Sequence, residues 1–167
     1  MKNILYVAKI ALPLLVICTL CAALLAGANA LTEPVITENS AKEKHEAIIN
    51  LFGDTGLTYK TLDCSAEGIN GLYEVTLSGG DTAYCADVVS SSKYGGAVNA
   101  MVSVDKDGVA LDVQIISHSE TFMSKYTDET GKYTKIDCIS GATYSFDAIR
   151  LAMSLAENAV LSLGGAS

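Results

Sequence analysis

The hydrophobic positions of the chain follow two different patterns. From Ile10 to Ala28 the sequence contains no charged residue. A helix of about 20 apolar residues is enough to cross the hydrocarbon core of a bilayer. After residue 31 the apolar positions become short and alternating. The pattern therefore predicts a membrane anchor over residues 1–31, followed by a folded domain over residues 32–167.

The charges around the apolar run predict its orientation. Lys2 and Lys9 precede it, whereas Glu33 and Glu38 follow it. Lysines near one end favour a cytoplasmic N-terminus, which places the domain on the extracytoplasmic side of the cell membrane. The tripeptide at 28–30 resembles an A-x-A cleavage site, so a removed signal peptide is the alternative. The length of the run favours a retained, single-pass anchor.

The domain reads as helix, strands, helix. We expect an extended linker over Leu31–Thr37, and then an amphipathic helix with the sequence ENSAKEKHEAIINLF. Five alternating runs predict strands at Leu57–Leu62, Gly71–Leu77, Ala83–Val89, Ala97–Val104 and Val109–Ser117. A final helix is predicted from Ser145, as its N-cap, to about Leu161. The fold class is α+β, with an antiparallel sheet flanked by helices.

One stretch before the final helix is unusually poor in side-chain bulk. Ser140, Gly141 and Ala142 leave the backbone accessible, Thr143 adds a hydroxyl, and Ser145 follows two residues later. A small-residue loop that leads into a helix N-terminus can hold a phosphate through backbone N–H groups and the helix dipole. A simple capping turn is the alternative interpretation of the same residues.

Charge and cysteine content limit the possible functions. Residues 1–31 hold two of the 11 Lys and Arg and none of the 19 Asp and Glu, so residues 32–167 carry a net charge of 9 − 19 = −10. Nucleic-acid binding is therefore not expected, because it needs clustered cations. Cys64, Cys85 and Cys138 allow one disulfide and one free thiol. The chain shows no zinc-site spacing, no nucleotide-binding glycine motif and no hydrolase elbow.

Four stretches together resemble the covalent FMN-binding domain family. Residues 140–145, SGATYS, resemble its S/D-G-A-T-x-S/T signature. Residues 94–98, YGGAV, resemble its G-Y-x-G-x-I stretch, and residues 101–108, MVSVDKDG, resemble its hairpin. His118-Ser119-Glu120-Thr121 resembles its H-x-E-T motif, although FMSK follows where P-G-L-G is usual. The family includes the G subunit of Rnf-type ion-translocating ferredoxin:NAD oxidoreductases and the C subunit of the sodium-translocating NADH:quinone oxidoreductase.

The resemblance implies a cofactor and a place for it. Thr143 would carry FMN as a phosphoester on its hydroxyl, attached by a flavin transferase that uses FAD as donor. Ser140, Gly141, Ala142 and Ser145 would surround the phosphate. The resemblance also implies that His118, Glu120 and Thr121 lie near the flavin ring, with Met101 or Tyr94 as packing neighbours.

The implied function is electron transfer rather than a complete enzymatic reaction. As an Rnf-type subunit, the protein would pass electrons among other membrane subunits of an ion-translocating complex. A stand-alone extracytoplasmic flavin carrier is a second possibility. The third belongs to a different class: an anchored binding module without a cofactor, in which SGAT serves only as a cap.

Overall fold

The computed structural model describes residues 2–93, 96–134 and 137–164, and their side chains from residue 11 to residue 163. Its elements are α1 (Lys2–Phe52), β1 (Thr58–Leu62), β2 (Ile69–Thr76), β3 (Thr82–Ser91), β4 (Ala97–Val104), β5 (Ala110–His118), the 3₁₀ turn η1 (Met123–Lys125) and α2 (Thr143–Gly164). The chain divides into two units, Met1–Lys42 and Glu43–Ser167. The predicted α+β class is confirmed.

The first unit is helical throughout its described length. α1 contains a stretch that is long and apolar enough to be a candidate membrane span. The predicted extended linker over Leu31–Thr37 is wrong, because α1 continues through it with Pro34 inside. A proline removes only one backbone hydrogen bond of the ladder. On both sides of it, threonine hydroxyls bond back into the helix, from Thr32 to Ala28 O at 3.0 Å and from Thr37 to Glu33 O at 2.9 Å.

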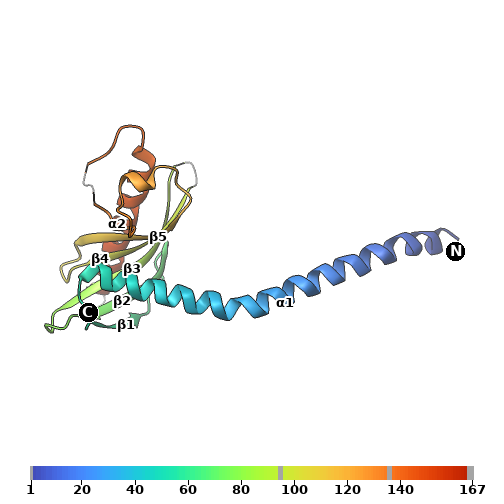
Figure 1. The fold of residues 1–167 in the computed structure, drawn as a ribbon, viewed down its shortest axis with the longest axis horizontal. Coiled ribbons are helices and arrows are strands. Elements are labelled where there is room, and N and C mark those ends of the chain that lie inside the picture. The colour runs from blue at the N-terminus through green and yellow to red at the C-terminus, as the bar shows by residue number, and fades with distance from the viewer. Residues whose placement is uncertain (1, 94–95, 135–136, 165–167) are drawn as a thin grey trace. The chain divides into compact units, whose positions relative to one another are not determined.

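The second unit is built on one antiparallel sheet with its strands in chain order, β1 to β5 (Figure 1). All five predicted strands are confirmed, with ends that differ by a few residues. The turn between β4 and β5 is closed by Asp105, whose carboxylate accepts the N–H groups of Asp107 and Val109 at 2.9 and 2.8 Å. Gly108 completes this turn with a φ of 84°, which favours glycine.

One face of the sheet is covered by α2. Alternating strand residues point to this side, and α2 supplies small side chains that allow a close approach of helix and sheet. The principal buried members are Leu72, Ala86, Val88, Val98, Val102, Val113, Ala148, Ile149, Ala152 and Ala156. The hydroxyl of Ser90 donates to Ala148 O at 2.9 Å, so this serine joins β3 to α2.

The other face of the sheet is covered by the last turns of α1, from Glu43 onward. The predicted amphipathic helix has its apolar stripe at Ala47, Ile48, Leu51 and Phe52, and this is confirmed: the first three are buried against the sheet, and Phe52 packs partly buried beside them. Beside them Lys44 Nζ lies 2.7 Å from Asp87 Oδ2, and this carboxylate on β3 is only 4% exposed. The helix end is therefore held to the sheet by an apolar contact and by a buried ion pair.

The start of α2 differs from the prediction. The helix begins at Thr143, so Ser145 is its third residue and not its N-cap. The prediction of Ser145 as a cap is therefore wrong. Ser145 is 1% exposed, and its hydroxyl is engaged by a side chain from another segment. Capping preferences are local, whereas this contact is tertiary, which is why the sequence placed the helix start two residues late.

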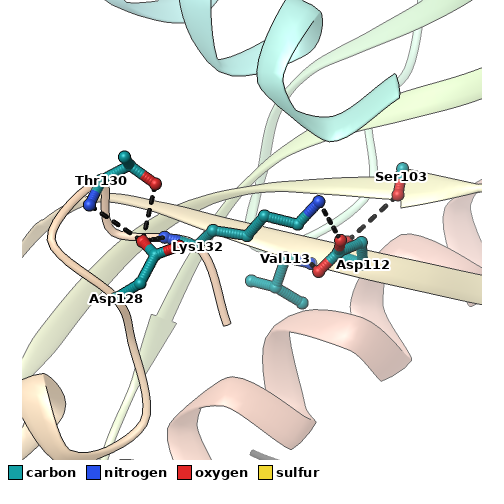
Figure 2. Close-up of polar contacts among 6 residues, drawn as sticks. All are labelled: Ser103, Asp112, Val113, Asp128, Thr130 and Lys132. Atoms are coloured by element: carbon teal, nitrogen blue, oxygen red, sulfur yellow. Dashed lines mark hydrogen bonds and ion pairs between the residues drawn. The ribbon is translucent and has the colours of Figure 1, made fainter. Parts of the chain in front are cut away.

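A loop after η1 adds to the free edge of β5. Tyr133 N donates to Val113 O at 2.8 Å, and Ile115 N donates to Gly131 O at 2.9 Å. Figure 2 shows how the carboxylate of Asp128 closes the loop by accepting from Thr130 and Lys132, while Lys132 Nζ lies 2.7 Å from Asp112 Oδ2. This loop protects part of a sheet edge that would otherwise be open to pairing.

Every cysteine of the chain is a free thiol. Cys85 is buried under the end of α1, and burial raises the pKa of its thiol. Cys138 is exposed and lies just before residues 140–143, which we call the SGAT stretch. The possibility of a disulfide among Cys64, Cys85 and Cys138, which all lie within the described residues, is therefore not realised in this structure.

Candidate functional site

A cavity of about 530 Å³ opens at the start of α2, and we call it the helix-start cavity. Its walls come from three places in the chain: the approach to β4, the segment after β5, and the turn before α2 together with the first residues of that helix. The lining residues are Gly96, Ser119, Glu120, Thr121, Phe122, Gly141, Ala142, Tyr144 and Ser145. Its volume is within the range of small-molecule sites in proteins.

The SGAT stretch forms a tight turn at the mouth of this cavity. Ala142 N donates to Ile139 O at 3.0 Å, and Gly141 has a φ of 81°. A positive φ at the third position of such a turn favours glycine. A Cβ added to Gly141 would meet no atom within 4 Å. The glycine is therefore required by backbone conformation, and the space above it is open.

The turn is held from behind by Tyr126, a fully buried residue that the sequence analysis did not single out. Its hydroxyl accepts Ile139 N–H at 2.8 Å and donates to Ala142 O at 3.2 Å. Burial raises the pKa of this hydroxyl, so it stays protonated and able to donate. Tyr126 lies in a polar stretch without periodicity, and so no pattern in the sequence indicated its position.

Thr143 is the first residue of α2, and it is exposed. It does not line the helix-start cavity, although residues on both sides of it do. The thiol of Cys138 lies 3.7 Å from its hydroxyl oxygen. Ser140 is also outside the cavity lining. The structure thus presents the Thr143 hydroxyl at the surface, at the N-terminus of a 22-residue helix.

Ser145 and Glu120 meet inside the cavity. The Ser145 hydroxyl donates to Glu120 Oε2 at 3.2 Å. A Cβ on Gly96 would lie 1.7 Å from Glu120 Oε1, so the absence of a side chain at Gly96 makes room for this carboxylate. The three residues are far apart in the chain, and only the fold brings them together. Gly96 is a second site residue that the sequence analysis did not weigh individually.

The HSET stretch, residues 118–121, contributes only part of its length to the cavity lining. Glu120 and Thr121 line it, whereas His118 ends β5 and lies outside the lining. Ser119 anchors the stretch to β4, because its hydroxyl accepts Ala97 N–H at 2.8 Å and its N–H donates to Ala97 O at 2.9 Å.

Of the two expected packing neighbours of a flavin ring, Met101 is not among the described residues that line the cavity. Met101 is buried with Val75 and Cys85 under the end of α1, on the face of the sheet opposite to α2. Its predicted role is wrong, because side chains of a strand alternate between faces and Met101 points to the other one. Tyr94 lies outside the described residues.

No metal site accompanies the cavity. Within residues 2–93, 96–134 and 137–164, no group of three or more His, Cys, Asp or Glu side chains is arranged to hold an ion. The polar groups of the cavity are one carboxylate and several hydroxyls, and such groups suit hydrogen bonding to an organic ligand.

Comparison with known proteins gives one family. Residues 93–157 match the family model of the FMN-binding domain. The matched range contains every described residue that lines the helix-start cavity, as well as Thr143. No curated protein matches the chain closely enough to count as a relative. The family match supports an FMN-binding domain over this part of the chain, and with it a flavin-binding, electron-transfer module.

Proposed function

We propose that the protein is a membrane-anchored flavoprotein that carries FMN covalently on Thr143 and passes electrons within an Rnf-type redox complex. One observation supports the choice of Thr143 as the attachment site. Thr143 presents an exposed hydroxyl at the first position of a long helix, directly after a turn whose glycine leaves open space. The match to the FMN-binding domain covers this site and supports the choice of cofactor.

The residues present fit a phosphate ester at Thr143. The first turn of a helix offers backbone N–H groups without intrahelical partners, and the helix dipole favours a negative charge there. The open space above Gly141 leaves room for phosphate oxygens beside the Thr143 hydroxyl. The carboxylate of Glu120 would repel a phosphate, and it lies inside the cavity while Thr143 lies outside the cavity lining.

The attachment reaction conserves atoms and involves no redox change. The Thr143 oxygen would attack the phosphorus on the flavin side of the FAD pyrophosphate, and the bond to the bridging oxygen would break. AMP leaves, and the hydroxyl proton passes to a base. A threonine hydroxyl is a weak nucleophile at neutral pH, so a separate flavin transferase with a divalent cation has to activate it. An exposed Thr143 is what such an enzyme requires.

We expect the Ser145–Glu120 pair to shape the cavity rather than to bind the phosphate directly. The Ser145 hydroxyl has one proton, which it donates to Glu120. Ser145 can donate to a phosphate only if it gives up this bond. With Thr121 and Phe122 nearby, the pair forms a polar and apolar wall against which one edge of a flavin ring can rest.

Membrane anchoring and electron transfer complete the proposal. When bound, FMN supplies one- and two-electron chemistry, and the protein supplies tethering, orientation and electrostatics. The candidate membrane span is consistent with single-pass anchoring. We place the domain on the extracytoplasmic side because the lysines precede the apolar run. The proposed partners are the other membrane subunits of the complex and the flavin transferase.

Coexpression of the full chain with a flavin transferase tests the central claim. We expect a yellow protein whose intact mass is higher by one esterified FMN, and whose flavin fluorescence persists in denaturing gels. Thr143→Ala should lose the attached flavin, and Thr143→Ser should keep some of it. Thr82→Ala, at an exposed threonine that begins β3, is the matched control and should be labelled like the wild type. Covalent flavin on the Thr143→Ala chain would refute the assignment.

Two further variants test the cavity. Gly96→Ala should push the Glu120 carboxylate away from Ser145, because the new methyl would overlap it. Ser145→Ala removes the same hydrogen bond from the other side. We expect both variants to keep the mass increase and to lower the labelled fraction, with a shifted flavin absorption spectrum. A labelled fraction and spectrum equal to those of the wild type in both variants would contradict a role for this pair.

Complex membership is tested by purification. In mild detergent, an affinity-tagged chain from its native membrane should retain other membrane subunits at a fixed ratio if it belongs to a complex. Recovery of the flavinylated chain alone, with full recovery of its electron-transfer activity, would favour the stand-alone carrier. Protease accessibility of residues 43–167 in intact spheroplasts checks the predicted orientation.

A further inference from the structure

A second cavity lies on the flank of α2, and its lining differs in character from that of the helix-start cavity. It has a volume of about 580 Å³. We call it the Arg150 cavity, and it is lined by Leu111, Asp112, Tyr133, Thr134, Phe146, Arg150 and Met153. Among the described lining residues, apolar and aromatic side chains therefore surround one cation, Arg150.

The aromatic wall of the Arg150 cavity is rigidly supported. Buried Tyr126 lies between the two lining aromatics, with its ring centroid 6.5 Å from that of Tyr133 and 5.7 Å from that of Phe146. The interplanar angles are 36° and 32°. Aromatic pairs at such spacings attract one another and hold their orientations. The cavity thus offers prearranged ring surfaces, to which Met153 adds a polarizable thioether.

The charges of the cavity favour an anion. Arg150, the only arginine of the chain, is exposed, and within the described part of the chain no carboxylate pairs with it. The carboxylate that does line the cavity belongs to Asp112, and it forms an ion pair with Lys132, with 2.7 Å between Lys132 Nζ and Asp112 Oδ2 (Figure 2). An unpaired guanidinium beside a neutralised carboxylate is suited to a planar acidic group, which it can bind through two parallel hydrogen bonds.

We propose that the Arg150 cavity binds a small, planar aromatic molecule with one anionic group. The rings would lie against Tyr133 and Phe146, and the anionic group would face Arg150. Thr143 and Arg150 are seven residues apart on α2, which places them within about 20° of one another around the helix and about 10 Å apart along it. A bound ligand would therefore lie on the same side of α2 as Thr143.

A binding experiment with methionine methyl labels tests this proposal without any flavin. The full-length Thr143→Ala chain, expressed without a transferase and reconstituted in nanodiscs, is labelled with ¹³C at the methionine methyls. The probe is anthraquinone-2-sulfonate. We expect a saturable shift of the Met153 methyl signal, because aromatic rings shift nuclei that lie close to their faces. Met101, buried under the end of α1, is the internal control and should not move.

Arg150 variants distinguish a specific site from simple partitioning. Arg150→Gln should raise the apparent Kd roughly tenfold or more, since the charge-assisted hydrogen bonds from the guanidinium to the anion are lost. Arg150→Lys should give an intermediate Kd, because it keeps the charge and loses the planar fork. Unsulfonated anthraquinone should bind equally well to the chain that retains Arg150 and to the Arg150→Gln variant. Unchanged Met101 and Met123 signals show that the variants are folded.

Two results would overturn the proposal. One is the absence of a saturable Met153 shift at millimolar probe. The other is an apparent Kd that Arg150→Gln leaves unchanged, since the anion would then not face the guanidinium. Neither result bears on Thr143, because the experiment uses a chain that cannot be flavinylated there. Conversely, failure of flavin attachment to the wild type would leave this experiment unaffected.

Discussion

The two faces of the sheet achieve burial by different means. Under α2 the contact is almost wholly apolar, with alanines on the helix and valines on the strands. Under the end of α1 the same strands bury Asp87, Ser103 and Gln114 beside apolar residues. The ammonium group of Lys44 balances the negative charge of Asp87. The side-chain oxygen of Gln114, in contrast, has no hydrogen-bond partner among the described residues.

The difference shows what each helix does for the sheet. An apolar contact contributes stability with little directional preference, whereas a buried ion pair adds little net stability and is sensitive to the loss of either partner. We therefore expect α2 to carry most of the stability of the domain. The attachment of the end of α1 is expected to depend, beside its apolar contact, on the geometry of the Lys44–Asp87 pair.

The largest effect should come from the α2 face. Ile149 is fully buried, and Ile149→Ala should lower the free energy of unfolding by about 3–4 kcal/mol through lost burial and an unfilled cavity. Leu151→Ala is the matched control, since Leu151 is 43% exposed on the same helix and should change the stability far less. Chemical denaturation monitored by circular dichroism measures both. Equal losses in the two variants would contradict a dominant α2 core.

Breaking the ion pair should have a smaller and asymmetric effect. Lys44→Met leaves the buried Asp87 carboxylate without its partner and should cost about 3 kcal/mol. Asp87→Asn should cost about 1 kcal/mol, because the Lys44 side chain is 35% exposed and can turn to water. The double variant Lys44→Met/Asp87→Leu should recover most of the loss. A double variant as unstable as Lys44→Met would show that the pair is not the source of the asymmetry.

The same pair predicts a pH dependence. The hydrogen bond to Asp87 raises the pKa of Lys44 above 10.5, although burial opposes this shift. Since the folded-state pKa is the higher one, the stability from the pair is complete below pH 10.5 and is lost as the pH rises through the folded-state value. Burial also raises the pKa of Tyr73. Its contribution to the free energy of unfolding therefore also falls as the pH rises. The stability difference between wild type and Lys44→Met should therefore shrink as the pH rises through the alkaline range.

A moderate effect is expected from the one tyrosine hydroxyl that holds the SGAT turn. Tyr126→Phe leaves Ile139 N–H without its partner and should cost about 2 kcal/mol. It should also lower the fraction of chain that the transferase labels, because the turn before Thr143 loosens. Tyr133→Phe is the control, since its hydroxyl makes no hydrogen bond among the described residues. Normal labelling of the Tyr126→Phe chain would mean that the turn does not need this support.

The smallest effect should lie in the loop on the edge of β5. Hydrogen bonds from Thr130 lower the pKa of Asp128 below 3.8, so its contribution is present above pH 3.8 and is lost as the pH falls through the lowered value. Amide exchange at Thr130 and Lys132, corrected for intrinsic rates, should accelerate over that range. In Asp128→Asn the corrected exchange should be independent of pH there. Asp107→Asn, at an exposed turn, should behave like the wild type.

Much of the fold was predictable because it depends on local periodicity. The five strands, the hairpin turn at 105–108 and the apolar stripe of Ala47, Ile48 and Leu51 follow from alternation and helical spacing. The helix through Pro34 and the early start of α2 were not predicted. Both depend on what surrounds the backbone, because a single proline or a missing polar cap costs less than the rest of the helix contributes.

The candidate site also combines features that the sequence predicts with features that only the fold creates. The sequence by itself determined the small-residue turn, the hydroxyl of Thr143 after it and the candidate anchor, because these depend on residues next to one another in the chain. Only the tertiary structure decided that Gly96 makes room for Glu120, that Ser145 faces this carboxylate and that Tyr126 supports the turn. It also placed Met101 on the opposite face and left Arg150 beside two aromatic rings. Such contacts join positions far apart in the chain, and local sequence patterns carry no information about which distant side chains will meet.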